Sequence, residues 1–121
     1  MKYFYVFLGT GFGGMLRYLI STKVYKFLPS LFPYGTLAVN ALGSFILGVL
    51  IFWFDDKELL NANLKLLLAV GFCGGLTTFS TFSFETFNLL RDSEFLLAIG
   101  NISLNLFITI LFVFIAYIIG R

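Results

Sequence analysis

The chain has 121 residues, of which 60% are hydrophobic, only 12% are charged and 17 are phenylalanine. Soluble domains carry about 25% charged residues, and a chain this short cannot bury so much apolar surface in one core, so an ordinary soluble domain is excluded. The formal net charge of +2 lacks the basic excess that nucleic acid requires, and we expect no nucleic-acid partner. With no histidine and one cysteine, Cys73, most nucleophilic and metal-dependent catalysis is excluded, and we expect no enzyme.

The charged residues divide the chain into four apolar stretches. Uncharged runs cover 28 residues from 27 to 54, 19 from 66 to 84, and 26 from 95 to 120, while 14 residues precede the isolated Arg17. A helix needs about 20 apolar residues to cross the lipid bilayer. We therefore predict an all-α membrane protein, one domain over residues 1–121 with four transmembrane helices at about 2–22, 34–54, 64–90 and 95–119.

The basic residues are divided almost evenly between the two sides of such a bundle. Arg17 lies near the second side or within its helix, and the others are Lys2, Lys57, Lys65 and Arg121 on one side and Lys23, Lys26 and Arg91 on the other. Orientation in the membrane follows an excess of Lys and Arg on one side, and here there is almost none. We therefore expect a dual-topology chain that forms an antiparallel homodimer, with weak orientation by one or two charges as the alternative.

The first predicted helix contains a glycine-rich run, Gly9-Thr10-Gly11-Phe12-Gly13-Gly14. This run formally matches a dinucleotide-binding fingerprint, but no strand-helix-strand pattern follows, and the first acidic residue is the distant Asp55. Close helix packing through Gly9 and Gly13 is the better interpretation.

Two stripes of polar residues follow the second and fourth predicted helices. They repeat every fourth residue, which places each set on one helix face, and they are Thr36, Asn40 and Ser44, and Asn101, Asn105 and Thr109. Such side chains can hold membrane helices together, or they can line a path whose amides and hydroxyls donate hydrogen bonds to a dehydrated ion. The sequence favours a path and leaves interhelical contact open.

The third predicted helix is expected to be broken at mid-membrane. Gly74 and Gly75 lower helix stability, and the Thr and Ser residues from 77 to 83 compete for backbone hydrogen bonds. Carbonyls freed at such a break are natural ligands for a cation such as Na⁺. A Gly-xxx-Gly contact face at Gly71 and Gly75 is the alternative, and the two can coexist.

Two phenylalanines and two charged residues of the predicted helices are candidates for contact with an ion. Phe79 and Phe82 share a helix face among polar residues, and the positive edge of a phenyl ring can meet an anion, although packing is the ordinary role of phenylalanine. Arg17 and Glu85 are the ionisable residues expected within or at the edge of the bilayer. We expect a structural role for both, with direct ion handling as the alternative.

Three segments together resemble the Fluc/CrcB family of fluoride channels. They are G-T-G-F-G-G-M-L-R at 9–17, G-T-L-A-V-N-A-L-G-S-F-I-L-G at 35–48 and G-F-C-G-G-L-T-T-F-S-T-F-S-F-E at 71–85. The third segment is the most specific. The resemblance implies a multi-pass protein of the cell inner (plasma) membrane, an antiparallel dual-topology homodimer with two pores that passively exports fluoride from the cytoplasm and so reduces its toxicity.

The resemblance also implies roles for individual residues. The carbonyls of Gly74 and Thr77 would hold a structural Na⁺ between the subunits, and Arg17 and Glu85 occupy the usual charged positions of the family. The fluoride pathway would comprise Asn40, Phe79, Ser80, Thr81, Phe82, Asn101, Asn105 and Thr109. The last three depart from the family pattern, since many members carry Tyr and Ser along this track.

Two other classes of membrane protein remain as alternatives. A small dual-topology multidrug exporter also has about four helices, but it needs a central carboxylate, and the first predicted helix offers Arg17 instead. A subunit that only assists assembly would have no use for two polar stripes and a broken helix.

Overall fold

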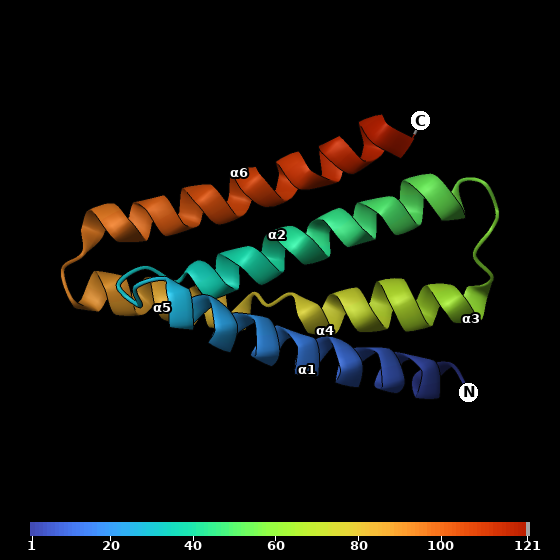
Figure 1. Ribbon diagram of the computed structural model, residues 1–121, viewed down its shortest axis with the longest axis horizontal. Helices are drawn as coiled ribbons and strands as arrows, with labels where there is room; N and C mark the ends of the chain where they lie inside the picture. The colour runs from blue at the N-terminus through green and yellow to red at the C-terminus, as the bar shows by residue number, and fades with distance from the viewer. Residues whose placement is uncertain (121) are drawn as a thin grey trace.

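The computed structural model describes residues 1–120, and these form helices joined by short connections (Figure 1). The helix α1 covers Lys2–Phe27, and α2 covers Tyr34–Val49 and continues as a π-helix, η1, over Leu50–Asp55. The third helical segment consists of α3 (Ala62–Lys65), the π-helix η2 (Leu66–Cys73), α4 (Gly74–Leu76) and α5 (Ser80–Arg91). The last helix, α6, covers Phe95–Gly120.

The four helical segments run back and forth along one long axis (Figure 1). The N-terminus, the connection 56–61 and the end of α6 lie at one end of the molecule, and the connections 28–33 and 92–94 lie at the other. The helix α2 packs on α6, while α1 packs mainly on η2 and α4. The all-helical class and the four helical segments are thus confirmed, and the predicted bounds differ from the observed ones by five residues at most.

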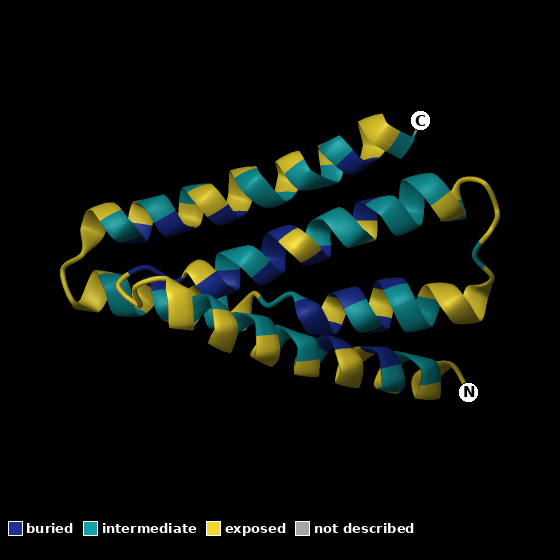
Figure 2. Cartoon of the chain, viewed as in Figure 1, coloured by how far each residue is buried: buried dark blue, intermediate teal, exposed yellow. Residues whose placement is uncertain are grey.

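Among residues 1–120, three helical segments are long and apolar enough to cross a membrane. They are Tyr34–Asp55, Ala62–Arg91 and Phe95–Gly120. The helix α1 has 26 residues but carries four basic side chains, so its assignment as a fourth span stays a prediction. The outer faces of the helices are largely exposed (Figure 2). Large apolar residues are among those exposed, such as Phe107 and Ile110 of α6 at 68% and 60%. Such surfaces suit lipid and not water.

Local sequence signals explain where several helices begin and end. The helix α1 stops at Phe27, because Leu28 precedes Pro29 and adopts an extended conformation. Asn61 caps α3, since its side-chain oxygen accepts a hydrogen bond from the Leu64 amide at 2.8 Å. An ion pair at 3.0 Å between Lys65 and Asp55 ties the two ends of the 56–61 connection together.

The single tryptophan attaches the end of α6 to the π-helical end of the second segment. The indole Nε1 of Trp53 donates a hydrogen bond to the Ala116 carbonyl at 2.8 Å. One residue away on each helix, the rings of Phe52 and Tyr117 pack edge to face with centroids 5.0 Å apart. These contacts fix the C-terminal part of α6, which lies beyond the last residue of its polar stripe.

Glycines allow α1 to approach the third segment at backbone distance. Gly9 and Gly13 are buried on α1, and Gly71 and Gly75 are buried on the facing elements η2 and α4. A methyl group at Gly71 would lie 2.9 Å from the Gly9 Cα atom and 3.0 Å from the Val6 carbonyl oxygen. Close packing through Gly9 and Gly13 is therefore confirmed, and so is the contact face at Gly71 and Gly75.

We predict that Gly71→Ala destabilises the fold, because the added methyl group meets backbone atoms that cannot move aside. The expected loss is about 1–3 kcal/mol, the usual cost of overpacking. Thermal unfolding in detergent, followed by circular dichroism, measures it. The control is Gly11→Ala on the exposed face of α1, where the new methyl group meets nothing within 4 Å. Equal melting temperatures for the two variants would contradict the prediction.

Candidate functional site

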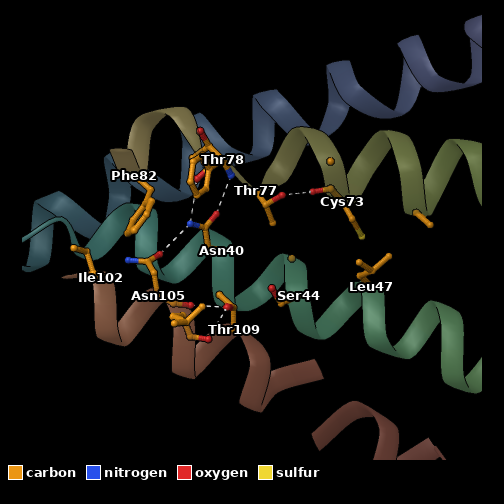
Figure 3. Close-up of a pocket in the computed structure, with 15 residues that line it drawn as sticks. Asn40, Ser44, Leu47, Cys73, Thr77, Thr78, Phe82, Ile102, Asn105 and Thr109 are labelled. Carbon is orange, nitrogen blue, oxygen red and sulfur yellow. Dashed lines mark hydrogen bonds between the residues drawn. The ribbon is translucent and has the colours of Figure 1, made fainter. Parts of the chain in front are cut away.

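A cavity of about 530 Å³ lies between α2, the third segment and α6 (Figure 3). Its polar lining comes from the two predicted stripes and from the junction of α4 and α5, and includes Asn40, Ser44, Thr77, Thr78, Asn105 and Thr109. Phe79 and Phe82 line the same cavity, and so does Gly74. Residues that are up to 69 positions apart in the sequence thus meet on one surface.

The backbone between α4 and α5 leaves the helical path at Thr77, Thr78 and Phe79. Thr77 is extended, with φ −92° and ψ 161°. The side-chain amide of Asn40 pairs with both backbone groups of Thr78, because Asn40 Oδ1 accepts from the Thr78 N–H at 2.8 Å and Nδ2 donates to the Thr78 carbonyl at 3.2 Å. One side chain of α2 therefore satisfies both peptide groups of Thr78, which have left the helical pattern.

This pairing and a second local hydrogen bond together leave the two carbonyls that the resemblance assigned to Na⁺ without their helical donors. In a continuous helix the N–H of Thr78 would donate to Gly74, and that of Thr81 to Thr77. Here the Thr78 N–H donates to Asn40, and the Thr81 N–H donates to the Thr78 hydroxyl at 3.2 Å. The Gly74 and Thr77 carbonyls lose their helical donors beside the cavity, and neutral backbone oxygens suit a hard monovalent cation. The donor set therefore fits Na⁺.

The amides of the two stripes are hydrogen-bonded to each other. Asn40 Nδ2 donates to Asn105 Oδ1 at 3.0 Å, and Asn105 Nδ2 donates to Asn101 Oδ1 at 2.9 Å. Asn105 and Thr109 line the cavity, and the Thr109 hydroxyl donates to the Asn105 carbonyl. Asn101 is fully buried and lies behind the cavity wall. Interhelical contact, the open alternative for the stripes, is thus present, while their role in a path stays a prediction.

The aromatic pair lies at the edge of the cavity. The ring centroids of Phe79 and Phe82 are 5.5 Å apart with an angle of 50° between the ring planes. Phe79 is 77% exposed, an unusual position for a packing residue. Ser80 is exposed and its hydroxyl lies 3.4 Å from that of Thr78, whereas Thr81 is half-buried.

The two charged residues lie at separate places. The Arg17 Nε donates to the Gly75 carbonyl at 2.9 Å, and so reaches the end of α4 from α1. Glu85 lines a smaller cavity of about 220 Å³ with Asn88 and Asp92, and its Oε1 is buried without a hydrogen-bond partner among residues 1–120. Within that part of the chain the two do not pair with each other.

A family model described as "CrcB-like protein, Camphor Resistance (CrcB)" matches residues 4–120. The chain belongs to the CrcB family. Three relatives carry the name "Fluoride-specific ion channel FluC". The protein of Pyrococcus abyssi is 47% identical over 94% of this chain and 91% of its own length. The protein of Magnetococcus marinus is 40% identical over 100% of this chain and 98% of its own length. The protein of Serratia proteamaculans is 52% identical over 84% of this chain and 79% of its own length.

Membership of the CrcB family makes the chain a multi-pass membrane protein of an ion-channel family and not an enzyme. The expectation that it lacks catalytic function is thereby confirmed. The same match decides against the multidrug exporter and the assembly subunit, the two alternatives that the residues left open.

The sequence did not predict one residue that contacts this site, Thr86. Thr86 of α5 is 7% exposed, and its hydroxyl oxygen accepts a hydrogen bond from Asn101 Nδ2 at 2.8 Å. The sequence contained one indication of such a residue, because a buried Asn in an apolar helix, here Asn101, needs a polar partner on a neighbouring element. The sequence could not say which helix would supply that partner.

We predict that Arg17→Met destabilises the fold, because the buried Gly75 carbonyl loses a charged donor. The expected loss is about 1–3 kcal/mol. Unfolding of the purified protein by titration with sodium dodecyl sulfate measures this loss. Lys23→Met changes an exposed basic residue of the same helix and serves as the control. A loss of the same size in both variants would show that the Gly75 contact contributes nothing.

Proposed function

We propose that this chain forms a fluoride-selective channel, which passively exports fluoride from the cytoplasm and so reduces fluoride toxicity. The observation that carries the proposal is the cavity, where the amide and hydroxyl groups of Asn40, Asn105 and Thr109 meet the rings of Phe79 and Phe82. Fluoride is small and strongly hydrated, so a path must replace its water with closely spaced donors and with positive ring edges. The printed name of the CrcB relatives supports the same ion.

The proposed pathway keeps all the residues that the resemblance named. Asn40, Phe79, Phe82, Asn105 and Thr109 would line it directly, since each lies on the cavity wall. Ser80 and Thr81 would contribute hydroxyls at the start of α5, and Asn101 would act from behind the wall. No Lys or Arg lies among these residues, which favours passage over tight anion binding.

The functional unit that we propose is an antiparallel dual-topology homodimer with four spans in each copy, α1 included. The cavity wall of one chain is incomplete, because Phe79 and Gly74 line it and are nevertheless exposed. A second copy inserted upside down would cover this face. The near-equal division of basic residues between the two ends supports both insertions.

We further propose that the α4–α5 connection is a helix break at mid-membrane depth and that a structural Na⁺ binds there. The carbonyls of Gly74 and Thr77 would hold the ion, and the second copy would supply the same pair. When bound, the ion supplies positive charge that neutralises the carbonyl dipoles of both chains. The Asn40 side chain keeps the Gly74 carbonyl free by taking the Thr78 N–H, and the Thr78 hydroxyl keeps the Thr77 carbonyl free by taking the Thr81 N–H.

We predict that the purified protein in liposomes releases fluoride down its gradient and retains chloride, because only the smaller anion fits among donors that replace its water. A fluoride-selective electrode measures the release, and a chloride electrode on parallel vesicles gives the comparison. Protein-free liposomes are the control. The absence of fluoride release, or equal release of both anions, would refute the proposed function.

We predict that Phe79→Ile and Phe82→Ile each lower fluoride efflux at least about tenfold, because the ring edges disappear while apolar bulk is retained. Size-exclusion chromatography checks that the oligomer is intact. Phe107→Ile, on the exposed face of α6, is the control and should conduct like the unaltered protein. Normal efflux in both pathway variants would remove the aromatic pair from the mechanism.

We predict that reporter fusions at the C-terminus give signal on both faces of the cell membrane, because neither end of the bundle has an excess of basic residues. Alkaline phosphatase and green fluorescent protein report the two sides. Adding two Lys residues to the 92–94 connection should shift all signal to one orientation. Signal on a single face from the unaltered chain would contradict dual topology.

A further inference from the structure

A continuous chain of hydrogen bonds runs from the backbone of the α4–α5 connection, along the cavity wall and then behind it, to the backbone of α5. Figure 3 shows its first two links, at Thr78, Asn40 and Asn105. Its five links run from Thr78 N–H to Asn40 Oδ1 (2.8 Å), Asn40 Nδ2 to Asn105 Oδ1 (3.0 Å), Asn105 Nδ2 to Asn101 Oδ1 (2.9 Å), Asn101 Nδ2 to Thr86 Oγ1 (2.8 Å), and Thr86 Oγ1 to the Phe82 carbonyl (2.8 Å). The chain connects α2, α5 and α6, and it begins and ends on the third segment.

The backbone groups at the two ends fix the direction of every link. A peptide N–H can only donate and a carbonyl can only accept, so Thr78 determines which end of the Asn40 amide is oxygen. Asn105 must then offer its oxygen to Asn40 and its nitrogen to Asn101. At the far end Thr86 donates its hydroxyl proton to the Phe82 carbonyl, which leaves only a lone pair for Asn101. All donors therefore point the same way.

We propose that Thr86 and Asn101 are positioning residues that fix the amide orientation of Asn105 and Asn40 on the cavity wall. Asn101 is completely buried and Thr86 is 7% exposed, and neither lines the cavity, whereas Asn40 and Asn105 do. The inference rests on the proposed function in one respect, namely that the cavity is the fluoride path. It adds Thr86 to the residues of the path and gives Asn101 a specific role, which both exert through other side chains.

Amide orientation matters for an anion because the two ends of the group have opposite polarity. An N–H end attracts fluoride and an oxygen end repels it, although the two ends have nearly the same size. Reversing Asn105 alone would place its nitrogen against the nitrogen of Asn40 and its oxygen against the carbonyl oxygen of Asn101. Such a reversal leaves several buried groups without partners, so the amides keep one orientation as long as Thr86 accepts from Asn101.

Thr86→Val tests the assignment, because valine keeps the shape of threonine and removes the acceptor of the Asn101 amide. We expect fluoride efflux from liposomes to fall about tenfold, the effect of losing one buried hydrogen-bond partner, while Thr86→Ser restores efflux to within about twofold. Thr22→Val on α1 is the matched control and should leave efflux unchanged. The Thr22 hydroxyl likewise bonds to carbonyls of its own helix but accepts no side-chain donor from residues 1–120.

A second measurement, on protein free of fluoride, tests the orientation of the Asn40 side-chain amide directly. In ¹H–¹⁵N spectra the side-chain amide signals of Asn40 should shift or double in Thr86→Val and return in Thr86→Ser, although Asn40 does not touch Thr86. Unchanged Asn40 signals would overturn the proposal even if efflux fell, because Thr86 would then act only locally. If the unaltered protein does not conduct fluoride, the proposed function fails, while the spectra still decide the orientation.

A measurement on the unaltered protein covers the case in which Thr86→Val does not fold. The side-chain amide hydrogens of Asn40 and Asn101 should exchange with solvent deuterium at least about a hundredfold more slowly than those of the exposed Asn63, because each is held in a buried bond. Equal exchange at Asn101 and Asn63 would overturn the proposal, since a freely turning amide cannot position its neighbours.

Discussion

The pairing of one side-chain amide with one peptide unit underlies the geometry of the whole site. Asn40 of α2 satisfies both the N–H and the carbonyl of Thr78, the middle one of the three residues that leave the helix. The same bond frees the Gly74 carbonyl, aligns Asn105 and ties α2 to the third segment. In a membrane, where water cannot replace a missing partner, an unhelical backbone persists only with such a substitute.

Other contacts hold the two sides of this junction. On the α1 side, glycine faces bring the backbones together, and Arg17 occupies the Gly75 carbonyl that α4 leaves open at its end. On the α6 side, the buried amides bridge to α2 and α5. The junction is thus supported by direct backbone approach on one side and by polar side chains on the other. Apolar surface, which dominates the composition, mainly faces outward toward lipid.

Much of the fold could be predicted because the charges and prolines mark the ends of the apolar stretches. The polar stripes could also be predicted, since a repeat of four residues places side chains on one helix face. The sequence could not show that Asn40 would pair with Thr78, because that contact depends on the depth at which two helices pack. For the same reason it did not single out Thr86, which resembles the other hydroxyl residues of α5 until Asn101 is placed beside it. Arg17 could be identified as unusual in a membrane helix. Its acceptor could not, because every residue has a backbone carbonyl and the sequence does not mark the one that Arg17 contacts.

The bond between Trp53 and the Ala116 carbonyl gives the protein an intrinsic optical probe. Indole emission depends on the polarity and hydrogen bonding around Nε1, and the chain contains no second tryptophan to obscure it. Because this contact attaches the end of α6, the emission spectrum reports whether that helix is docked on α2. Loosening of α6 in any variant can therefore be followed in intact bilayers by fluorescence, without attaching a label.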